Sequence, residues 1–433
     1  MRCFIICSPS SSAVSKSRWK TSISSQYKIG ETLTVKIEKI VPNGFGLAFA
    51  ENLTVFVPLS AGGDELRVKI NQIKGKTAFA EIVEIIEPSP ARVEPRCPYF
   101  GRCGGCDFQQ LNYAAQLEAK IGIVRDCLSR IGKINYEREI PIIGSPHEYE
   151  YRSRAQWHVA ARQKKIGYFQ RKTHEIIDVE VCPILIPDLE KILTELRETI
   201  EWESFWSAMV EIETAAAGGE VSIYSAEIIE PTEEISFTAH GETYWHDATS
   251  FFQGNPFLIE QLVEAAVKDA NGESALDLYC GVGLFTLPLA RKFQKVVGVE
   301  GYDKAVDFAE KNVEQARLTS VRFYRENVGD WLNENAANLK NLDFVLLDPP
   351  RSGTEKETIE NLLKIKPRQI SYVSCEPSTL ARDLKILTEN GYSIESITAF
   401  DLFPQTHHVE TIVRLKLDVK NTQTLRLGLK PCE

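Results

Sequence analysis

One cysteine, Cys375, stands where a thiol could act as a nucleophile. It follows the strand-like run Ile370–Val373, and a helical pattern follows it through Leu387. A thiol at a strand end and near a helix N-terminus lies close to the positive end of the helix dipole, so we expect its pKa to fall below about 8.5. The alternative is a small buried cysteine without a chemical role, which is the commoner case for this residue type.

A second segment carries groups that could accept a proton. His407, His408 and Glu410 precede the alternating run Ile412–Leu417, which favours a strand. Imidazole and carboxylate side chains are the usual general bases in enzymes. Spacing alone does not choose among these three residues.

Asp348 ends a third strand-like run, Leu342–Leu347, and is followed by Pro349, Pro350 and Arg351. The two prolines fix the backbone after the carboxylate. The carboxylate is thereby held at a strand end, where it could bond a flat base or a cofactor. A turn capped by Asp is the alternative interpretation.

Two glycines could bring the backbone close to a ligand. The run Ala275–Tyr279 leads into Gly281 and Gly283, and the next strand-like run ends at Glu300. Glycines at the carboxyl end of a strand allow close approach of a cofactor, and an acid about 20 residues later can accept hydrogen bonds from ribose hydroxyls. The pattern predicts a nucleoside-type cofactor without separating NAD from S-adenosylmethionine.

Four cysteines have a spacing typical of metal ligands. Cys97, Cys103 and Cys106 lie within ten residues, and Cys182, followed by a proline, is the best candidate for a fourth ligand. In a chain without an export signal, clustered cysteines indicate ligands more often than disulfides. Four thiolates could hold zinc or a [4Fe–4S] cluster, and spacing alone leaves both open.

The charge of the chain is unevenly distributed. The net charge is −10, yet residues 183–250 hold 15 acidic and two basic residues, which leaves +3 for the remainder. Residues 150–175 carry seven Lys or Arg and two Glu. Because phosphate contacts need local positive charge, we expect this stretch, with Arg152 and Arg154, to contact RNA.

The elements that must position these residues follow from periodicity and turns. Strands with glycine turns between them predict a small OB-like β-barrel, and alternating helices and apolar strands predict a doubly wound α/β sheet. The chain divides into a disordered tail (1–25), the barrel (26–87), a central mixed α+β domain (88–245), the α/β domain (246–417) and a second tail (418–433). The α/β strands are expected at 275–279, 295–300, 321–324, 342–347 and 369–374.

These segments together resemble the RNA (uracil-5-)-methyltransferase family. The residues that carry the resemblance are Phe251-Phe252-Gln253-Gly254-Asn255, Asp277-Leu278-Tyr279-Cys280-Gly281-Val282-Gly283, Asp348-Pro349-Pro350-Arg351, Ser374-Cys375-Glu376-Pro377 and His407-His408-Val409-Glu410-Thr411. The resemblance covers about residues 26–417 and implies a Rossmann-like methyltransferase domain. The barrel looks like a TRAM domain, which would bind RNA. One departure is Leu284, where many members have Asn.

The resemblance also implies roles for single residues. Cys375 would add to carbon 6 of uracil, and Glu410 would remove the proton from carbon 5. The four cysteines would hold a [4Fe–4S] cluster in the central domain. The residues that would bind S-adenosylmethionine are Gln253, Tyr279, Glu300 and Asp348.

A TRAM-like barrel together with the cysteine set is more similar to the ribosomal-RNA branch of the family than to its bacterial tRNA branch. We therefore expect 23S rRNA as the substrate, with tRNA as the alternative. We also expect a cytoplasmic monomer. A membrane partner is not expected, because no apolar run approaches the roughly 20 residues that span a bilayer.

Three other functions stay open at this point. An RNA cytosine-5 methyltransferase would use the same addition chemistry, but that group typically has a second active-site cysteine, and none follows a proline in the 348–350 loop. An amino-methyltransferase shares the Asp-Pro-Pro sequence, but its usual following aromatic is Arg351 here. A non-catalytic RNA-binding iron–sulfur protein would not need Cys375 or Glu410.

Overall fold

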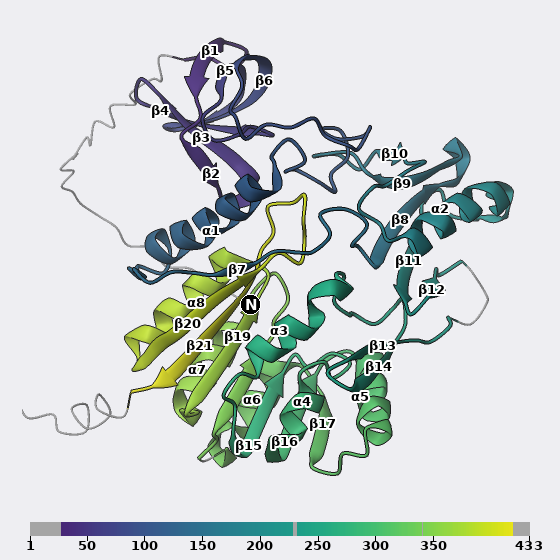
Figure 1. Cartoon of the computed structure of the whole chain (residues 1–433), viewed down its shortest axis with the longest axis vertical. Helices are drawn as coiled ribbons and strands as arrows, with labels where there is room; N and C mark the ends of the chain where they lie inside the picture. The colour runs from purple at the N-terminus through teal and green to yellow at the C-terminus, as the bar shows by residue number, and fades with distance from the viewer. Residues whose placement is uncertain (1–26, 228–231, 340, 419–433) are drawn as a thin grey trace, which may run out of the picture.

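The computed structural model describes residues 27–227, 232–339 and 341–418. The chain forms a barrel, a central antiparallel sheet, a two-stranded hairpin and a large mixed sheet (Figure 1). The expected tails, 1–25 and 418–433, lie outside the described residues apart from Asp418. Within the described ranges, no helix has both the length and the hydropathy needed to cross a membrane.

The amino-terminal barrel is a six-stranded sheet in the order β1-β5-β6-β4-β3-β2. Its strands are β1 (Thr32–Lys36), β2 (Lys39–Val41), β3 (Phe45–Ala50), β4 (Leu53–Pro58), β5 (Glu65–Lys74) and β6 (Thr77–Glu87). Alternate residues point inward, so Val55 and Val57 on β4 are fully buried with Val68 and Ile70 on β5. This alternation closes an apolar core inside the barrel.

The central part is built on a five-stranded antiparallel sheet in the order β10-β9-β8-β11-β12. Its strands are β8 (Arg154–Ala160), β9 (Lys165–Phe169), β10 (Ile176–Asp178), β11 (Val210–Ala217) and β12 (Glu220–Tyr224). Helix α2 (Pro187–Thr199) buries Leu189 and Leu193 in the same core as Trp157 of β8. The hairpin of β13 (Ile235–Ala239) and β14 (Glu242–His246) follows.

The carboxyl-terminal part is an eight-stranded sheet in the order β17-β16-β15-β18-β19-β21-β20-β7. Its strands are β15 (Gly272–Leu278), β16 (Phe293–Glu300), β17 (Val321–Arg325), β18 (Phe344–Leu347), β19 (Gln369–Ser374), β20 (Tyr392–Phe400), β21 (Glu410–Leu417) and β7 (Ile142–Ile143). Its helices are α3 (Ile259–Ala266), α4 (Thr286–Ala290), α5 (Asp303–Gln315), α6 (Val328–Asn335), α7 (Lys356–Ile365) and α8 (Pro377–Glu389). Strands β15 to β19 are parallel, which confirms the doubly wound sheet.

Two elements from the stretch between the barrel and the central sheet pack with the large sheet. Helix α1 (Tyr113–Arg130) buries Val124 and Leu128 in a core cluster of that sheet, and β7 pairs with the end of β20. Figure 1 shows α1 between the barrel and the large sheet. Helix α1 and strand β7 therefore pack with the large sheet, although they precede the central sheet in the chain. The apolar face of α1 packs against α8.

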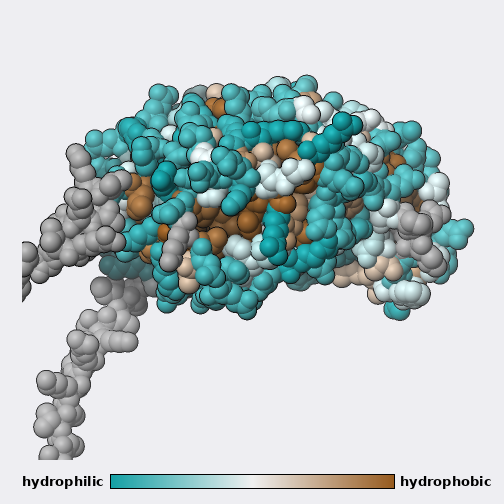
Figure 2. All heavy atoms as spheres, turned by 90° about the horizontal axis from the view of Figure 1, so that it is seen from below, coloured by the Kyte–Doolittle hydropathy of each residue, from teal (hydrophilic) through white to brown (hydrophobic). Residues whose placement is uncertain are grey.

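The surface outside these cores is mostly hydrophilic. Figure 2 shows the molecule from below, where hydrophilic side chains cover most of the face and hydrophobic ones gather in a band across its middle. The apolar residues of the central strands are instead buried between the layers, since the second half of β15 and nearly all of β18 and β19 are inaccessible.

Candidate active site

Cys375 and Glu410 meet at the ends of two neighbouring strands. In the register of β19 and β21, Ser374 faces Thr411, and Cys375 and Glu410 are the next residues outward. Cys375 is half-buried, whereas only 3% of Glu410 is exposed. Because β21 runs antiparallel to β19, its first residue lies beside the end of β19.

Asp348 and Arg351 approach the same point from β18, the other neighbour of β19. The carboxylate of Asp348 is close enough to raise the pKa of both Cys375 and Glu410, and the guanidinium of Arg351 opposes both effects. Arg351 is exposed at the rim of the site. The strand ends thus assemble a thiol, two carboxyl groups and one cation.

The thiol of Cys375 does not have the lowered pKa expected from its place near a helix. Burial and the nearby carboxylates of Glu410 and Asp348 raise the pKa of Cys375 to about 12. Helix α8 begins at Pro377, as the sequence indicates, but its dipole is outweighed by desolvation of the thiolate. The sequence-based expectation of a lowered pKa was wrong for the ligand-free site.

The three candidate bases differ in their surroundings. Burial, with His407 and Arg351 nearby, lowers the pKa of His408 to about 3, so its imidazole holds a proton only weakly. His407 is engaged by Asp107, whose carboxylate lies 2.5 Å from its Nδ1. Burial and Asp348 raise the pKa of Glu410 well above its usual range. Once deprotonated, a carboxylate with raised proton affinity removes a proton more readily than the weakly basic imidazole of His408.

The glycine turn after β15 is open on one side. Gly281 has a φ of +53°, and no heavy atom lies within 4 Å of the position that a Cβ would take there. The carboxylate of Glu300 accepts hydrogen bonds from the backbone N–H of Gly281, at 3.1 Å, and of Tyr302, at 2.8 Å. The turn therefore holds Glu300 beside a space that a ligand can enter.

Three carboxyl groups gather around this turn, those of Glu300, Asp348 and Asp277. Asp277 was not among the expected cofactor residues. Its side chain is fully buried and accepts a hydrogen bond from Thr286 Oγ1 at 2.5 Å. Burial raises the pKa of Asp277 to about 7, and burial with Asp277 and Glu300 nearby raises that of Asp348 to about 7. Such an acidic site suits a cationic sulfonium and repels the pyrophosphate of a dinucleotide.

Tyr279 and Gln253, the other expected cofactor residues, lie differently. The Tyr279 hydroxyl donates to Glu355 and lies 3.4 Å from Thr358 Oγ1, so the end of its ring is held by α7 and the residue before it. Gln253 is buried in a small cavity that Arg154 and His246 also line. In the described part of the chain, no hydrogen bond joins Gln253 to the other three residues.

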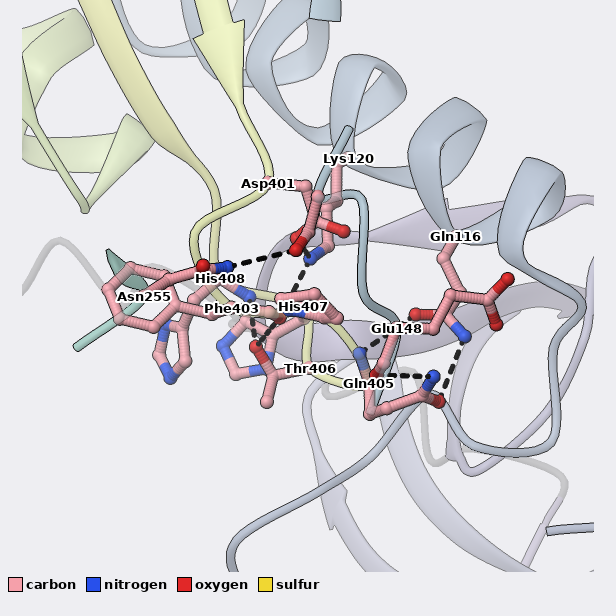
Figure 3. A network of polar contacts seen from close by, with 12 residues as sticks. Gln116, Lys120, Glu148, Asn255, Asp401, Phe403, Gln405, Thr406, His407 and His408 are labelled. Atoms are coloured by element: carbon pink, nitrogen blue, oxygen red, sulfur yellow. Dashed lines mark hydrogen bonds and ion pairs between the residues drawn. The ribbon is translucent and has the colours of Figure 1, made fainter. Parts of the chain in front are cut away.

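The loop 401–409 leads from β20 to Glu410, and side chains from the stretch 107–120 clamp it (Figure 3). The Lys120 ammonium pairs with Asp401, and both side chains are fully buried. The Gln116 amide donates to Gln405 Oε1 at 3.0 Å and accepts from the Gln405 backbone N–H at 2.9 Å.

Asp107 completes this clamp from the segment directly after Cys106. Its carboxylate accepts a hydrogen bond from the backbone N–H of His407 at 2.8 Å, and its own N–H donates to the carbonyl of Gln405. The contacts of Asp107, Lys120 and Gln116 could not be predicted from the sequence. Their partners lie about 280 to 300 residues away, and no local pattern indicates them.

The four clustered cysteines come together. Cys97, Cys103, Cys106 and Cys182 line one cavity with Arg152. Burial raises the pKa of Cys182 to about 12, and Arg152 opposes the effect. Among the described residues, no group of three or more His, Cys, Asp or Glu side chains has the arrangement to hold a single metal ion.

The basic residues of the stretch 150–175 divide into two groups: Arg162, Lys164 and Lys172 are exposed, whereas Arg152 and Arg154 point into the fold. Arg152 faces the cysteine cavity and donates to the carbonyl of Arg154. Arg154 donates to the carbonyls of Asp247 and Ala248. The expectation for these two arginines was wrong, because their charges satisfy buried groups of the fold instead of facing solvent.

A parallel sheet with a glycine turn, an acidic cofactor space and helices on both faces defines a Rossmann-like methyltransferase domain. A family model described as tRNA (Uracil-5-)-methyltransferase matches residues 210–418, and a TRAM domain model matches residues 26–83. The second match confirms the TRAM prediction for the barrel.

Individual relatives extend this result over nearly the whole chain. A 23S rRNA (uracil(1939)-C(5))-methyltransferase RlmD of Pectobacterium atrosepticum is 31% identical, covering 88% of this chain and 93% of that protein. An uncharacterized RNA methyltransferase of Aquifex aeolicus is 32% identical, covering 89% of this chain and 98% of that protein.

A solved structure agrees with the sequence relatives. The tRNA (uracil-54, C5)-methyltransferase of Pyrococcus abyssi, in complex with S-adenosyl-L-homocysteine, matches with a TM-score of 0.67 and 27% identity, over 88% of this chain and all of that one. The chain belongs to the RNA (uracil-5-)-methyltransferase family and is an S-adenosylmethionine-dependent enzyme.

Proposed function

We propose that the chain methylates carbon 5 of a uridine in 23S rRNA, with Cys375 as nucleophile and Glu410 as base. The observation that carries this proposal is the register of β19 and β21, which sets Cys375 and Glu410 side by side. A nucleophile and a base on adjacent strand ends can act on carbons 6 and 5 of one ring.

The reaction has four steps: addition, methyl transfer, proton removal and elimination. The sulfur of Cys375 adds to carbon 6, which turns carbon 5 into a nucleophile. Carbon 5 then takes the methyl group from the sulfonium of S-adenosylmethionine, and S-adenosylhomocysteine is left. Glu410 removes the carbon 5 proton, the bond from sulfur to carbon 6 breaks, and the ring double bond returns.

The chain's own groups prepare these steps. Arg351 is the cation that favours the thiolate of Cys375, and the neighbouring carboxyl groups of Asp348 and Glu300 favour a cationic donor. Glu300 sits against the open glycine turn, where ribose hydroxyls can reach it. Gln253 and Tyr279 are assigned to the same cofactor by the family resemblance.

We assign a [4Fe–4S] cluster to Cys97, Cys103, Cys106 and Cys182. The four thiols line one cavity, and the family resemblance favours a [4Fe–4S] cluster over zinc there. The positive charge of Arg152 at the cavity offsets part of the negative charge of four thiolates. The cluster would connect the loop before α1 to the central sheet.

We favour ribosomal RNA because this chain combines a TRAM barrel with a cluster of four cysteines. The relative from Pectobacterium is named as a 23S rRNA enzyme, and the one from Pyrococcus as a tRNA enzyme. Mapping 5-methyluridine in the ribosomal and transfer RNA of a deletion strain decides between the two. Loss of the modification from tRNA alone would refute the 23S assignment. A monomeric state and a cytoplasmic location remain expectations.

The first prediction separates the two catalytic roles. Cys375→Ala removes the attacking sulfur, so neither a covalent adduct nor methylated RNA should form. Glu410→Gln keeps the shape of the side chain but removes the base, so methyl transfer should occur and release should stall. A protein–RNA band that carries labelled methyl and survives denaturing electrophoresis should accumulate with Glu410→Gln.

The contrast between the variants is the control, since misfolding would abolish both signals. Normal turnover by Glu410→Gln would assign the base to another group. An adduct formed by Cys375→Ala would place the nucleophile elsewhere.

A further inference from the structure

The cation that faces Cys375 is carried by a tight turn. The backbone N–H of Gly353 donates to the carbonyl of Pro350 at 2.8 Å, which closes a β-turn with Arg351 in its second position. Gly353 has a φ of +78°, in the left-handed region that glycine adopts without strain. The backbone of the turn is therefore well defined, although the Arg351 side chain is exposed at the rim of the site.

Helix α8 packs directly against this turn. A Cβ on Gly353 would lie 2.7 Å from the Cβ of Thr379 and 2.8 Å from Nη2 of Arg382, and both of these residues are on α8. These separations are well below the 3.5 to 4.0 Å, roughly, at which nonbonded atoms attract each other best. Any larger residue at this position would push the turn away from the helix.

The residue after the turn, Thr354, is tied to a buried carboxylate on α8. Its hydroxyl donates to Asp383 Oδ2 at 2.8 Å, and its carbonyl accepts from Arg382 Nη2 at 3.0 Å. Arg382 also donates to Asp383, from Nε at 2.7 Å and from Nη2 at 3.1 Å. Tyr372 of β19 donates to the same Oδ2 at 2.7 Å. Asp383 thus joins the turn, its own helix and the strand that leads to Cys375.

This network fixes geometry more than it adds stability. Asp383 is only 1% exposed, and burying a carboxylate carries a large desolvation cost. Apolar residues of similar volume often stabilise a core as well as a buried charge does. A fully hydrogen-bonded carboxylate, however, restricts the positions of all its donors, because each donor must stay in place for the charge to be satisfied.

The same helix also positions the segment of Cys375. Helix α8 begins at Pro377, two residues after Cys375, and Glu376 caps it by accepting a hydrogen bond from the Ser378 N–H at 3.2 Å. The first turn of α8 is therefore joined to the segment of the thiol, and its second turn holds the loop of Arg351. One rigid element sets the separation between the thiol and the guanidinium.

Charged groups from three elements face the thiol of Cys375. Burial raises its pKa, and the carboxyl groups of Glu410, at the start of β21, and Asp348, after β18, raise it further. Arg351 lowers the pKa, through its charge and as a hydrogen-bond donor. Because a charge acts less at greater distance and a hydrogen bond needs close contact, this effect depends on where the turn places the guanidinium.

We propose that Asp383 is a positioning residue: it holds the turn of Arg351 against α8, and this keeps the guanidinium beside the sulfur of Cys375. The inference rests on the proposed function, because it assumes that Cys375 is the nucleophile. Asp383 does not touch the reacting atoms. It acts through Thr354 and the turn, so its loss should change the reactivity of the thiol.

The test measures that reactivity on the full chain, without RNA or cofactor. Iodoacetamide is added at values from about pH 6 to about pH 9, and alkylation of the peptide that contains Cys375 is followed by mass spectrometry. Thr354→Val keeps a side chain of similar size but removes its hydrogen bond to Asp383. Asp383→Asn replaces one oxygen by an NH2 group that cannot accept from the surrounding donors. Lys385→Gln is the matched control, because Lys385 pairs with Glu389 on the same helix.

We expect Asp383→Asn and Thr354→Val to slow alkylation at neutral pH by roughly 3- to 10-fold, with the pH profile shifted upward by about half to one unit. Complete loss of the Arg351 charge sets the upper end of this range. Lys385→Gln should react like the unaltered protein. In protein that also carries Arg351→Gln, neither substitution should slow alkylation further, because no guanidinium is left to hold in place.

Unchanged alkylation of Cys375 in a folded Asp383→Asn or Thr354→Val protein would overturn the proposal. An equal slowing with and without Arg351 would also overturn it, since Asp383 would then affect the thiol by another route. If Asp383→Asn does not fold, the Thr354→Val protein decides. Methylation of RNA is measured separately. Its absence from the unaltered protein would refute the proposed function and leave the link from Asp383 to the thiol as measured.

Discussion

Arg351 is the positive group that faces the candidate nucleophile. Its charge opposes the effects of burial, Glu410 and Asp348, which together hold the pKa of Cys375 at about 12. At neutral pH the ligand-free thiol is therefore almost entirely protonated, and below that pKa the thiolate fraction rises about tenfold for each unit of increasing pH. Reactivity of the free enzyme should accordingly increase with pH through the neutral range.

The second prediction concerns this residue. Arg351→Gln removes the cation, so the pKa of Cys375 should rise further and alkylation by iodoacetamide should slow by roughly tenfold at neutral pH. The methylation rate should shift toward higher pH by the same displacement. Arg351→Lys keeps a charge and should lie between the two. Identical pH profiles for all three proteins would show that Arg351 does not act on the thiol.

At the scale of elements, the antiparallel strand β21 brings Glu410, the proposed base, to Cys375, the proposed nucleophile 35 residues earlier in the chain. Gln405, within the loop before β21, has a φ of +67°. Contacts from the stretch that includes α1 hold the loop in place, with Lys120 and Asp401 fully buried among them. The position of Glu410 therefore depends on an element far away in sequence.

The third prediction tests this dependence. Lys120→Met leaves Asp401 buried without its cation, so the free energy of unfolding should fall by about 3 to 5 kcal/mol. Adding Asp401→Leu should restore most of this stability, because two apolar groups replace the pair. Arg67→Met is the control, since its pair with Glu84 is about half exposed and should cost less than about 1 kcal/mol.

Denaturant titration measures all four proteins. A stability of the Lys120→Met variant within the range of Arg67→Met would mean that the buried pair does not hold the loop. A double variant as unstable as the single one would mean that the pair acts through contacts other than charge.

At the scale of the molecule, the cysteine site lies where three parts of the chain meet. The loop of Cys97 to Cys106 forms an isolated bridge from Cys103 to Gln170, the residue after β9, and Cys182 comes from the segment before α2. Asp107, next in the chain, reaches the loop before Glu410. A cluster here would fix the central sheet relative to the clamp without touching the cofactor turn.

The fourth prediction follows from that location. Protein purified without oxygen should contain about four irons and four sulfides per chain. Cys182→Ala should release the iron and lower the melting temperature of the central part, while affinity for S-adenosylmethionine stays unchanged. Cys127→Ala is the matched control, because Cys127 is buried in α1 outside the cysteine cavity. Stoichiometric zinc without iron would refute the cluster.

Local features of this protein could be predicted from its amino-acid sequence. Strand ends could be recognised because a glycine turn, a proline pair and a change of periodicity are encoded within a few residues, and β19 spans the residues expected for it. The parallel sheet followed from alternation of helices and strands. The segments that resemble the family further predicted which strand ends hold the candidate catalytic residues.

Features that depend on contacts between distant segments emerged only from the folded chain. Helix α1 joins the catalytic part, Arg152 and Arg154 turn inward, and Asp277 adds a fully buried carboxyl group beside Glu300 and Asp348. The raised pKa of Cys375 arises from desolvation and from charges on β18 and β21. Burial and long-range electrostatics are properties of packing, and no window of neighbouring residues contains them.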